Sequence, residues 1–596
     1  MFQRLKPFAF VLIGLTLISS SVRAERPACY KLLPTKTLAY VRIADIKELG
    51  ERYNETSMGR MFQEEQLQSL TSQLFEEAED AFTPVSDEIG LSLSELLSIP
   101  SGEVALAVTA PPRGFPAPVL MVDVEGQEAN AIQLLDVLQE KIKEDGKLTA
   151  STEVVGSTKL TVFSQDEDER FTGMIFFRRD GMLVMTSNMD IAQQIVAAWD
   201  GDEEQKVLEQ NEDFADVMRH SKGPREAIPQ IRWYIDPISF AKVGLRGNTG
   251  AQMGLAMLPA VGLDGLLAIG GSMTFASDEY DAFIQTHVIT AEPRTGALAA
   301  IAMKSGSNEP EDWVPHDVSS YLTMHWDFGK TQKEVATLFN SFRGDDAFEE
   351  QVLARANEAL GMDVMEEVVG AMEGRISLAT WIPKPTRVNN FAYVGGIHLK
   401  EGEDFQDTWQ KMLEKAPSGE EPEEKSYGGF TIYSAPGEEE EVDDAEDPDI
   451  LKPLPVKISV AIVDDCLLIA NRPEYLERAI VSRSASAKSL KNELDFKLVA
   501  SKARRQPGGR TPGYFSFNRP EEGMRMMYDL ATAEKTREGL AGAAENNEFL
   551  GRINQALEDN PLPPFEKLRD YLAPTGSIIK ADEKGFHYIG FGLRRK

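Results

Sequence analysis

Cysteine is scarce in this chain: among 596 residues there are only two, Cys29 and Cys466. A scaffold held together by several disulfides is therefore excluded. In an oxidising compartment the two thiols could form one bridge between the amino-terminal arm and the second half of the chain. In the other interpretation Cys466, which lies in an apolar strand-like segment, is a small core residue. Both interpretations stay open, because the sequence does not place the two Cα atoms within ~7 Å of each other.

Histidine is also scarce, with six residues, and no HExxH motif or closely spaced histidine pair occurs. Zinc therefore has no recognisable ligand set. Residues 270–274 lack the last glycine of a nucleophile elbow. Residues 244–250 lack both the GxGxxG order and the lysine of a phosphate-binding loop. The pair His316 and Asp317 is too isolated to indicate catalysis. The sequence thus predicts no catalytic, cofactor-binding or metal-binding residue.

Basic residues are outnumbered, and long apolar runs are missing beyond the amino terminus. The 62 Lys and Arg face 96 Asp and Glu, a net charge of −34 that disfavours nucleic acid as a partner. Residues 1–24 combine Arg4 and Lys6 with a short apolar stretch and a small-residue ending, which indicates a signal peptide cleaved near Ala24. We therefore expect an extracytoplasmic mature chain without a transmembrane span. Whether the signal is instead kept as an anchor stays open.

Acidic residues gather between 438 and 449, in a segment that separates two predicted strands. A calcium loop would alternate its ligands and carry a glycine at the sixth position, and this segment has neither feature. Blocks of like charge repel one another and stay solvated. We therefore predict a disordered acidic hairpin insertion at about 436–452.

An internal repeat is the most informative feature that the sequence does contain. Segments between about 30 and 300 recur in the same order between 313 and 596. The spacing between matched positions varies while their order is kept, as in the pairs Pro34 and Pro315, Gly90 and Gly361, Asp180 and Asp464, and Ser272 and Ser577. Loops and helices therefore differ in length between two copies of one unit.

The order of predicted elements within each copy mixes hairpins with helices. This order favours an α+β fold with two duplicated modules, each a mainly antiparallel sheet with helices packed on one face. We place the modules at 25–300 and 313–596, joined by a linker at 301–312. Two modules suit the length, because single cores stop growing beyond roughly 250 to 300 residues. The alternative is one continuous sheet shared by both halves.

The repeat also bears on the histidines, because none has a histidine at the corresponding position of the other copy. His316 corresponds to Thr35, His398 to Val124, and His587 falls near Phe283. A site built symmetrically by duplication is expected to show paired ligands. The distribution therefore argues against acid–base or metal chemistry.

Four segments carry a resemblance to known proteins: 32–43, 58–61, 89–97 and 100–107. They resemble large exported bacterial proteins of the family named domain of unknown function 3352. The similarity covers most of the mature chain and is densest in residues 30–125. It implies an exported bacterial protein with no agreed activity, so no residue role is carried over.

These observations lead us to expect a non-catalytic extracytoplasmic protein that binds a ligand or takes part in cell-envelope organisation. Its partner would be an unknown protein, glycan or apolar ligand, held in a cleft between the modules. One alternative is a secreted hydrolase that uses carboxylates, which predicts convergent acids of shifted pKa. Another is a carrier of an apolar ligand in a dry cavity between the modules.

Overall fold

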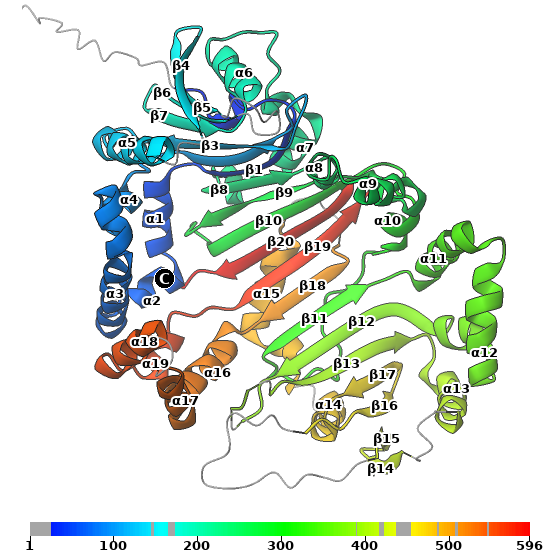
Figure 1. Ribbon diagram of the computed structural model, residues 1–596. Coiled ribbons are helices and arrows are strands. Elements are labelled where there is room, and N and C mark those ends of the chain that lie inside the picture. Colours follow the sequence, from blue (N-terminus) through cyan, green and yellow to red (C-terminus); the bar gives the residue numbers. More distant parts are fainter. Residues whose placement is uncertain are drawn as a thin grey trace, which may run out of the picture.

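The computed structural model describes residues 26–595 except 145–147, 165–172, 385, 389, 416–421, 437–454, 485–487, 507–510 and 545–547. The predicted signal peptide and nearly all of the predicted acidic insertion lie outside the described residues. The described residues form a 20-stranded sheet with helices packed along it (Figure 1). We call residues 26–300 the first half and residues 301–595 the second half.

The first half contributes ten strands, in which every pair of neighbours is antiparallel. Their bounds are β1 (Thr37–Ile43), β2 (Val104–Thr109), β3 (Ala117–Asp123), β4 (Thr149–Val155), β5 (Thr158–Ser164), β6 (Met174–Arg179), β7 (Met182–Thr186), β8 (Ile231–Ile235), β9 (Leu266–Phe275) and β10 (Tyr280–Thr290). They lie side by side in the order β4, β5, β6, β7, β3, β2, β1, β8, β9, β10.

The second half repeats this arrangement. Its strands are β11 (Ser320–His325), β12 (Met372–Trp381), β13 (Ala392–Leu399), β14 (Glu423–Tyr427), β15 (Phe430–Ser434), β16 (Ser459–Val463), β17 (Cys466–Ala470), β18 (Tyr514–Asn518), β19 (Thr575–Asp582) and β20 (Gly585–Leu593). Their order is β14, β15, β16, β17, β13, β12, β11, β18, β19, β20. Raising each strand number of the first half by ten reproduces the order of the second.

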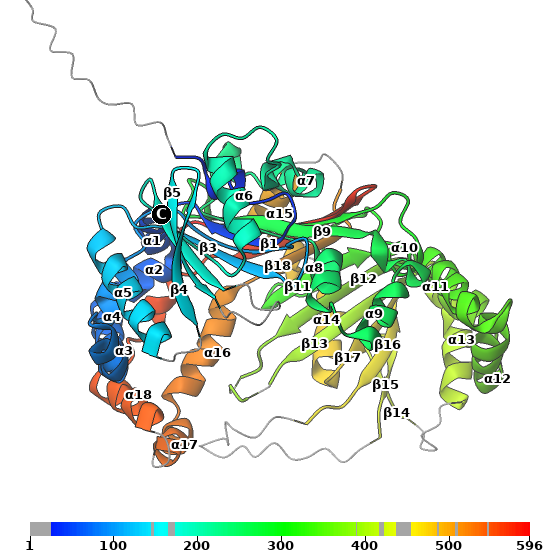
Figure 2. The same cartoon turned by 45° about the horizontal axis from the view of Figure 1, so that its top comes forward.

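The two halves join through β10 and β20, which pair antiparallel along most of their length. We call this pairing the seam. It leaves β4 and β14 at opposite ends of one continuous sheet (Figure 1, Figure 2). The predicted α+β class with a mainly antiparallel sheet is confirmed, and the sheet is shared by both halves, as the alternative arrangement expected.

Helices of the two halves also pack against each other, at two places on either side of the seam. On one side α3 (Glu65–Ile89) packs against α18 (Glu548–Asp559), and on the other α10 (Gly296–Ala300) packs against α11 (Phe328–Arg343). Met61, Leu67 and Leu70 share a buried cluster with Phe565 and Leu568. The halves are therefore joined by a sheet ladder and by apolar contacts, and not by a single flexible connection.

Helices cover both faces of the sheet, so the prediction of one covered face is wrong in this respect. Met182 and Val184 of β7 share a core with α6 (Met189–Trp199) and α7 (Glu212–His220). Leu183, between them, packs with α5 (Glu128–Glu144). Because successive strand residues point to opposite faces, both faces are apolar here. The continuous apolar run in residues 174–177 is typical of a strand buried on both sides.

The other α-helices have the bounds α1 (Ile46–Asn54), α2 (Ser57–Phe62), α4 (Leu93–Ser98), α8 (Pro237–Gly244), α9 (Thr249–Ala256), α12 (Ala354–Leu360), α13 (Gly402–Glu414), α14 (Pro473–Ser484), α15 (Leu494–Arg504), α16 (Pro520–Thr532), α17 (Glu534–Ala544) and α19 (Phe565–Arg569). Local signals begin several of them. The Asn211 side chain accepts a hydrogen bond from the Phe214 amide at the start of α7. A proline occupies the first turn of α8 and of α16. Among the described residues, no helix combines the length and apolarity that crossing a membrane requires.

Residues 301–312, predicted as a linker, are held against the second half. Met303 forms an isolated bridge with Trp326. Glu311 is buried and accepts a hydrogen bond of 2.8 Å from the Tyr321 hydroxyl. The same carboxylate lies 3.0 Å from Arg375 Nε and 2.9 Å from His398 Nε2. This segment is therefore part of the fold of the second half.

Candidate functional site

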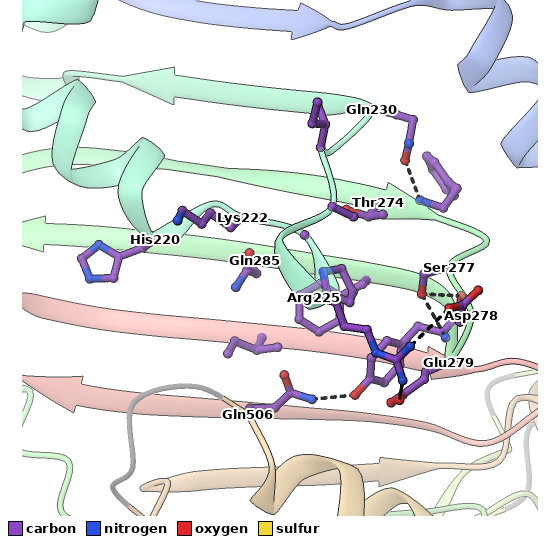
Figure 3. Close-up of a pocket in the computed structure, with 18 of the residues that line it drawn as sticks. His220, Lys222, Arg225, Gln230, Thr274, Ser277, Asp278, Glu279, Gln285 and Gln506 are labelled. Carbon is purple, nitrogen blue, oxygen red and sulfur yellow. Dashed lines mark hydrogen bonds and ion pairs between the residues drawn. The ribbon is translucent and has the colours of Figure 1, made fainter.

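A cavity of about 1330 Å³ lies over the seam and takes its lining from both halves. Its floor is formed by β9, β10, β20 and β19. Its walls come from α1, from residues 222–230 after α7, and from the end of α15. In Figure 3, His220, from α7, lies to the left of Gln285 of β10, and Gln506, which follows α15, lies below it. The site therefore lies where the two halves meet, which is where a cleft was expected.

Two rows of four residues cross the floor in register, and directly opposed residues share one face of a sheet. One row, the histidine row, contains Gly270 of β9, His287 of β10, His587 of β20 and Lys580 of β19. The other, the phenylalanine row, contains Gly576 of β19, Phe591 of β20, Phe283 of β10 and Thr274 of β9. Gln285 and Ile589 form the pair that lies between the rows.

The two rows occupy matching places in the strand order of the two halves, with Gly270 opposite Tyr234 of β8 and Gly576 opposite Phe517 of β18. This register matches Ser577 with Gly271, so the predicted match of Ser272 with Ser577 is wrong by one residue. A Cβ atom on Gly270 would collide with Val217 of α7, and one on Gly576 would collide with Val499 of α15. Each glycine thus lets one helix approach the sheet closely. The rows are related by an approximate twofold axis at the Gln285–Ile589 pair, and His287 and His587 occupy the positions of Phe591 and Phe283.

Three histidines gather at one end of the cavity. The ring centroid of His220 lies 5.3 Å from that of His287 and 5.0 Å from that of His587, and the last two are 5.1 Å apart. The Nδ1 atoms of His287 and His587 are 2.9 Å apart. His587 Nε2 lies 3.1 Å from a carboxylate oxygen of Asp582.

These contacts assign the tautomers of the pair. An ionised carboxylate only accepts, so His587 donates from Nε2 to Asp582. Neutral His587 then accepts at Nδ1 from the Nδ1–H of His287. This leaves His287 Nε2 as an acceptor, and that buried atom has no hydrogen bond of good geometry, although the His220 backbone lies close enough to oppose the lowering of the His287 pKa. The site therefore contains one unsatisfied buried acceptor.

Burial keeps these basic groups from charging readily. Burial, followed by the nearby His587 and His220, lowers the pKa of His287 to about 3. Burial also lowers the pKa of His587. Lys580 is 8 % exposed, donates a hydrogen bond of 3.0 Å to the Gln506 carbonyl, and has its pKa lowered by burial. At neutral pH the histidine pair is therefore uncharged.

The opposite end of the cavity is aromatic. The ring centroid of Tyr280 lies 5.2 Å from that of Phe283 and 5.5 Å from that of Phe591. Lys502 Nζ lies 5.7 Å from the Tyr280 ring centroid and 2.6 Å from Glu279. Gln506 donates a hydrogen bond of 2.9 Å to the Tyr280 hydroxyl. Equivalent positions thus present imidazoles at one end and benzene rings at the other.

Charged side chains surround the cavity with an excess of bases. Seven lining residues are basic and five acidic: Arg52, Arg219, Lys222, Arg225, Arg505, Lys580 and Arg594 against Glu48, Glu55, Asp278, Glu279 and Asp582. Arg225 reaches Asp278 at 3.3 Å and Glu279 at 2.6 Å (Figure 3). In the whole chain 62 basic residues face 96 acidic ones, so the cavity reverses the overall balance.

The residues singled out in the sequence fall mostly outside this cavity. Cys29 and Cys466 are free and buried in the cores of different halves, so no bridge joins them. His316 is exposed, and Asp317 accepts a hydrogen bond from the Trp381 indole. Of the six histidines, His587 does reach the cavity, together with His220 and His287.

A smaller cavity, of about 700 Å³, surrounds Glu311, Arg375 and His398. The Glu311 carboxylate also accepts from the Ser377 hydroxyl at 2.5 Å, so its oxygens are already satisfied. Cys466 lies here too, but burial raises its thiol pKa to about 12 and keeps it protonated. A protonated thiol is a poor nucleophile. These contacts therefore hold residues 301–312 against the second half.

The histidine cluster was missed because its members come from three separate elements. The alternation of β10 and β20 shows which residues share a face, but the sequence does not show that these strands pair. Within the described residues, no group of three or more His, Cys, Asp or Glu side chains is arranged to hold a metal ion. No family model matches the chain, and no curated protein or solved structure matches it either.

Proposed function

We propose that this protein is a non-catalytic, extracytoplasmic binding protein whose ligand occupies the cavity over the seam. The observation that carries the proposal is a cavity that is lined at one end by the imidazoles of His287 and His587 and at the other by the ring of Phe283, whose partner Phe591 lies buried in the core behind it. A concave site with an apolar part and a few convergent polar groups is typical of ligand binding.

The size of the cavity supports a sizeable ligand. Pockets for small molecules usually measure about 300 to 1,000 Å³. At about 1330 Å³ this cavity exceeds that range, and Ile228 at its edge is 71 % exposed. A ligand with an apolar portion would cover such a side chain. This favours a carrier or binding protein over a purely structural one.

The carboxylates of the cavity give less support to the hydrolase alternative. Asp278 and Glu279 face Arg225, Asp582 faces His587, and Glu55 pairs with Arg594 at 3.0 Å. A hydrogen bond from Lys502 lowers the pKa of Glu279. Carboxylate catalysis needs one acid with a raised pKa beside an ionised partner. Carboxylates that are paired in this way stabilise the edge of the cavity and are not arranged for acid–base catalysis.

The history and location of the chain are part of the same proposal. We propose that the two halves arose by duplication, which their matched strand order supports. We also propose export directed by residues 1–24. Membership of the exported family that most of the mature chain resembles is a proposal of the same kind.

Native mass spectrometry of the mature protein, purified from the extracytoplasmic fraction of its host, tests the binding function. We expect a discrete added mass on the wild type. The variant Ala227→Trp/Ile228→Trp, which fills the cavity edge from two exposed positions, should lose that mass. Val154→Trp is the matched control, because Val154 is 72 % exposed and Ile228 71 %. A bare wild-type mass, or an added mass that the cavity variant retains, would overturn the proposal.

A further inference from the structure

We propose that the ligand of the seam cavity is an amphipathic anion. Its carboxylate or phosphate head group lies at the histidine row, and its apolar portion extends toward the phenylalanine row. This inference rests on the proposed binding function and adds the chemical class of the ligand.

Lys580 and the histidines supply the groups that an anionic head requires. Lys580 is a cation in a buried position, directly opposite His587. Its Nζ donates to the Gln506 carbonyl, and its ammonium group would also attract an anionic head group placed beside it. Arg219 and Lys222, near the end of α7, line the same side, and Arg219 is already paired with Asp216 at 2.5 Å. A cationic head group would meet repulsion at this end of the cavity.

Because His287 Nε2 lacks a hydrogen bond of good geometry, we infer that His287 takes up a proton when the ligand binds. A buried acceptor without a donor costs free energy, and an anion alone would not satisfy it. If His287 gains a proton, Nε2–H becomes a donor that can bind the head group. The charged and titratable groups around it are His587 from β20, Lys580 and Asp582 from β19, and His220, Asp216 and Arg219 from α7. The Asp582 carboxylate stabilises positive charge on His587, which is hydrogen-bonded to His287. One added proton is therefore shared between the two histidines.

The phenylalanine row argues for an apolar portion. Phe283 and Tyr280 line the opposite end, Ile589 lies between the rows, and Ile228 is exposed at the edge. An alkyl or ring system along this path would be removed from water. The net charge of −34 repels anions at long range. An anionic ligand therefore depends on the excess of basic residues that line the cavity.

Isothermal titration of the mature protein with four probes tests this inference. The probes are dodecanoate, dodecyl phosphate, dodecanol and dodecyltrimethylammonium, each below its micelle concentration. We expect the anions to bind about tenfold or more tightly than dodecanol, the factor that one charge-assisted hydrogen bond supplies. The two anions distinguish a carboxylate from a phosphate head. Titrations in two buffers of different ionisation enthalpy should show net proton uptake for the anions and none for dodecanol.

The variant His287→Phe/His587→Phe places in the histidine row the same pair of side chains that the phenylalanine row already holds. It should bind dodecanoate only as tightly as dodecanol and show no proton uptake. His316→Phe, at an exposed position outside the cavity, should behave as the wild type. If the double variant fails to fold, the comparison of probes on the wild type still decides the question.

Equal binding of dodecanol and dodecanoate by the wild type, abolished by Ala227→Trp/Ile228→Trp, would overturn the head-group assignment and leave the cavity as the binding site. The same conclusion follows if no anionic probe binds while a neutral or cationic molecule copurifies in the cavity. Probe binding that the cavity variant does not weaken would overturn both the assignment and the proposed site.

Discussion

His287 of β10 lies directly opposite His587 of β20, with their Nδ1 atoms 2.9 Å apart. The two residues are not equivalent in the repeat, since His287 corresponds to Phe591 and His587 to Phe283. Antiparallel pairing of two matching strands brings every position, except the Gln285–Ile589 pair at the axis, against one on the other side of the axis and not against its own counterpart. The absence of paired histidines in the repeat therefore did not exclude a histidine cluster.

Stability should fall with acid because of His287. Its pKa is about 3 in the folded protein and near 6.5 unfolded, so below pH 6.5 the unfolded chain binds the extra proton. The contribution is fully present above about pH 6.5 and is lost as pH falls toward 3, at up to about 1.4 kcal/mol per pH unit. Urea unfolding of the wild type and of His287→Phe measures this slope. The slope should be shallower in the variant and unchanged in His316→Gln, and equal slopes would contradict the assignment.

Glu311 should be essential for the stability of the second half. Its carboxylate is buried between Arg375 and His398, and these donors lower its pKa despite the opposing effect of burial. Glu311→Ala leaves a buried guanidinium without its partner, which should cost about 3 to 5 kcal/mol in unfolding free energy. Glu309→Ala, a neighbouring exposed position, is the control. Chemical denaturation of both variants checks this, and similar losses would show that the Glu311 ion pairs contribute little.

Gly576 and Gly270 should differ in how their replacement can be rescued. Gly576→Ala forces a collision with the Val499 side chain, whereas Gly270→Ala meets both the Val217 side chain, at 2.6 Å, and the Trp233 carbonyl, at 2.5 Å. Each should destabilise the protein by about 1 to 3 kcal/mol. Val499→Ala should relieve the first, giving a coupling of about 1 kcal/mol in a double-mutant cycle.

Val217→Ala should rescue Gly270→Ala less well, because a backbone oxygen cannot be trimmed. Gly254→Ala in α9 is the control, since a Cβ atom there meets nothing within 4 Å. Thermal unfolding of the single and double variants measures the effect. Equal rescue at both glycines would show that the Trp233 carbonyl does not limit the replacement of Gly270, and no rescue at either would count against the close approach of the helices.

The two cysteines should behave as inert thiols. Burial raises the pKa of Cys466 to about 12 and also raises that of Cys29. Thiolate is the reactive form, so both should resist alkylation in the native protein and react after unfolding. Intact-mass measurement after iodoacetamide in denaturant should show two additions without prior reduction. No addition, together with a mass lower by two hydrogens, would instead show a bridge.

Local patterns in the sequence determined the α+β class and the order of elements in each half. Helix starts are local, so Pro237 and Pro520 fall in the first turns of α8 and α16, as the repeat indicated. Strand alternation is also local, and the recurring order of its segments matches the strand order of the two halves. Hairpins need only neighbouring segments, which is why they could be read from turn residues and periodicity.

Tertiary structure alone decided which strands meet across the halves. An unpaired edge such as β10 must find another strand, but apolar alternation does not specify which one or in what register. The pairing of β10 with β20 brings together His287 and His587, 300 residues apart in sequence, and the packing of α7 adds His220. The same packing keeps Cys29 and Cys466 in separate cores. The histidine cluster thus depends on the register of β10 against β20. No local sequence pattern encodes that register.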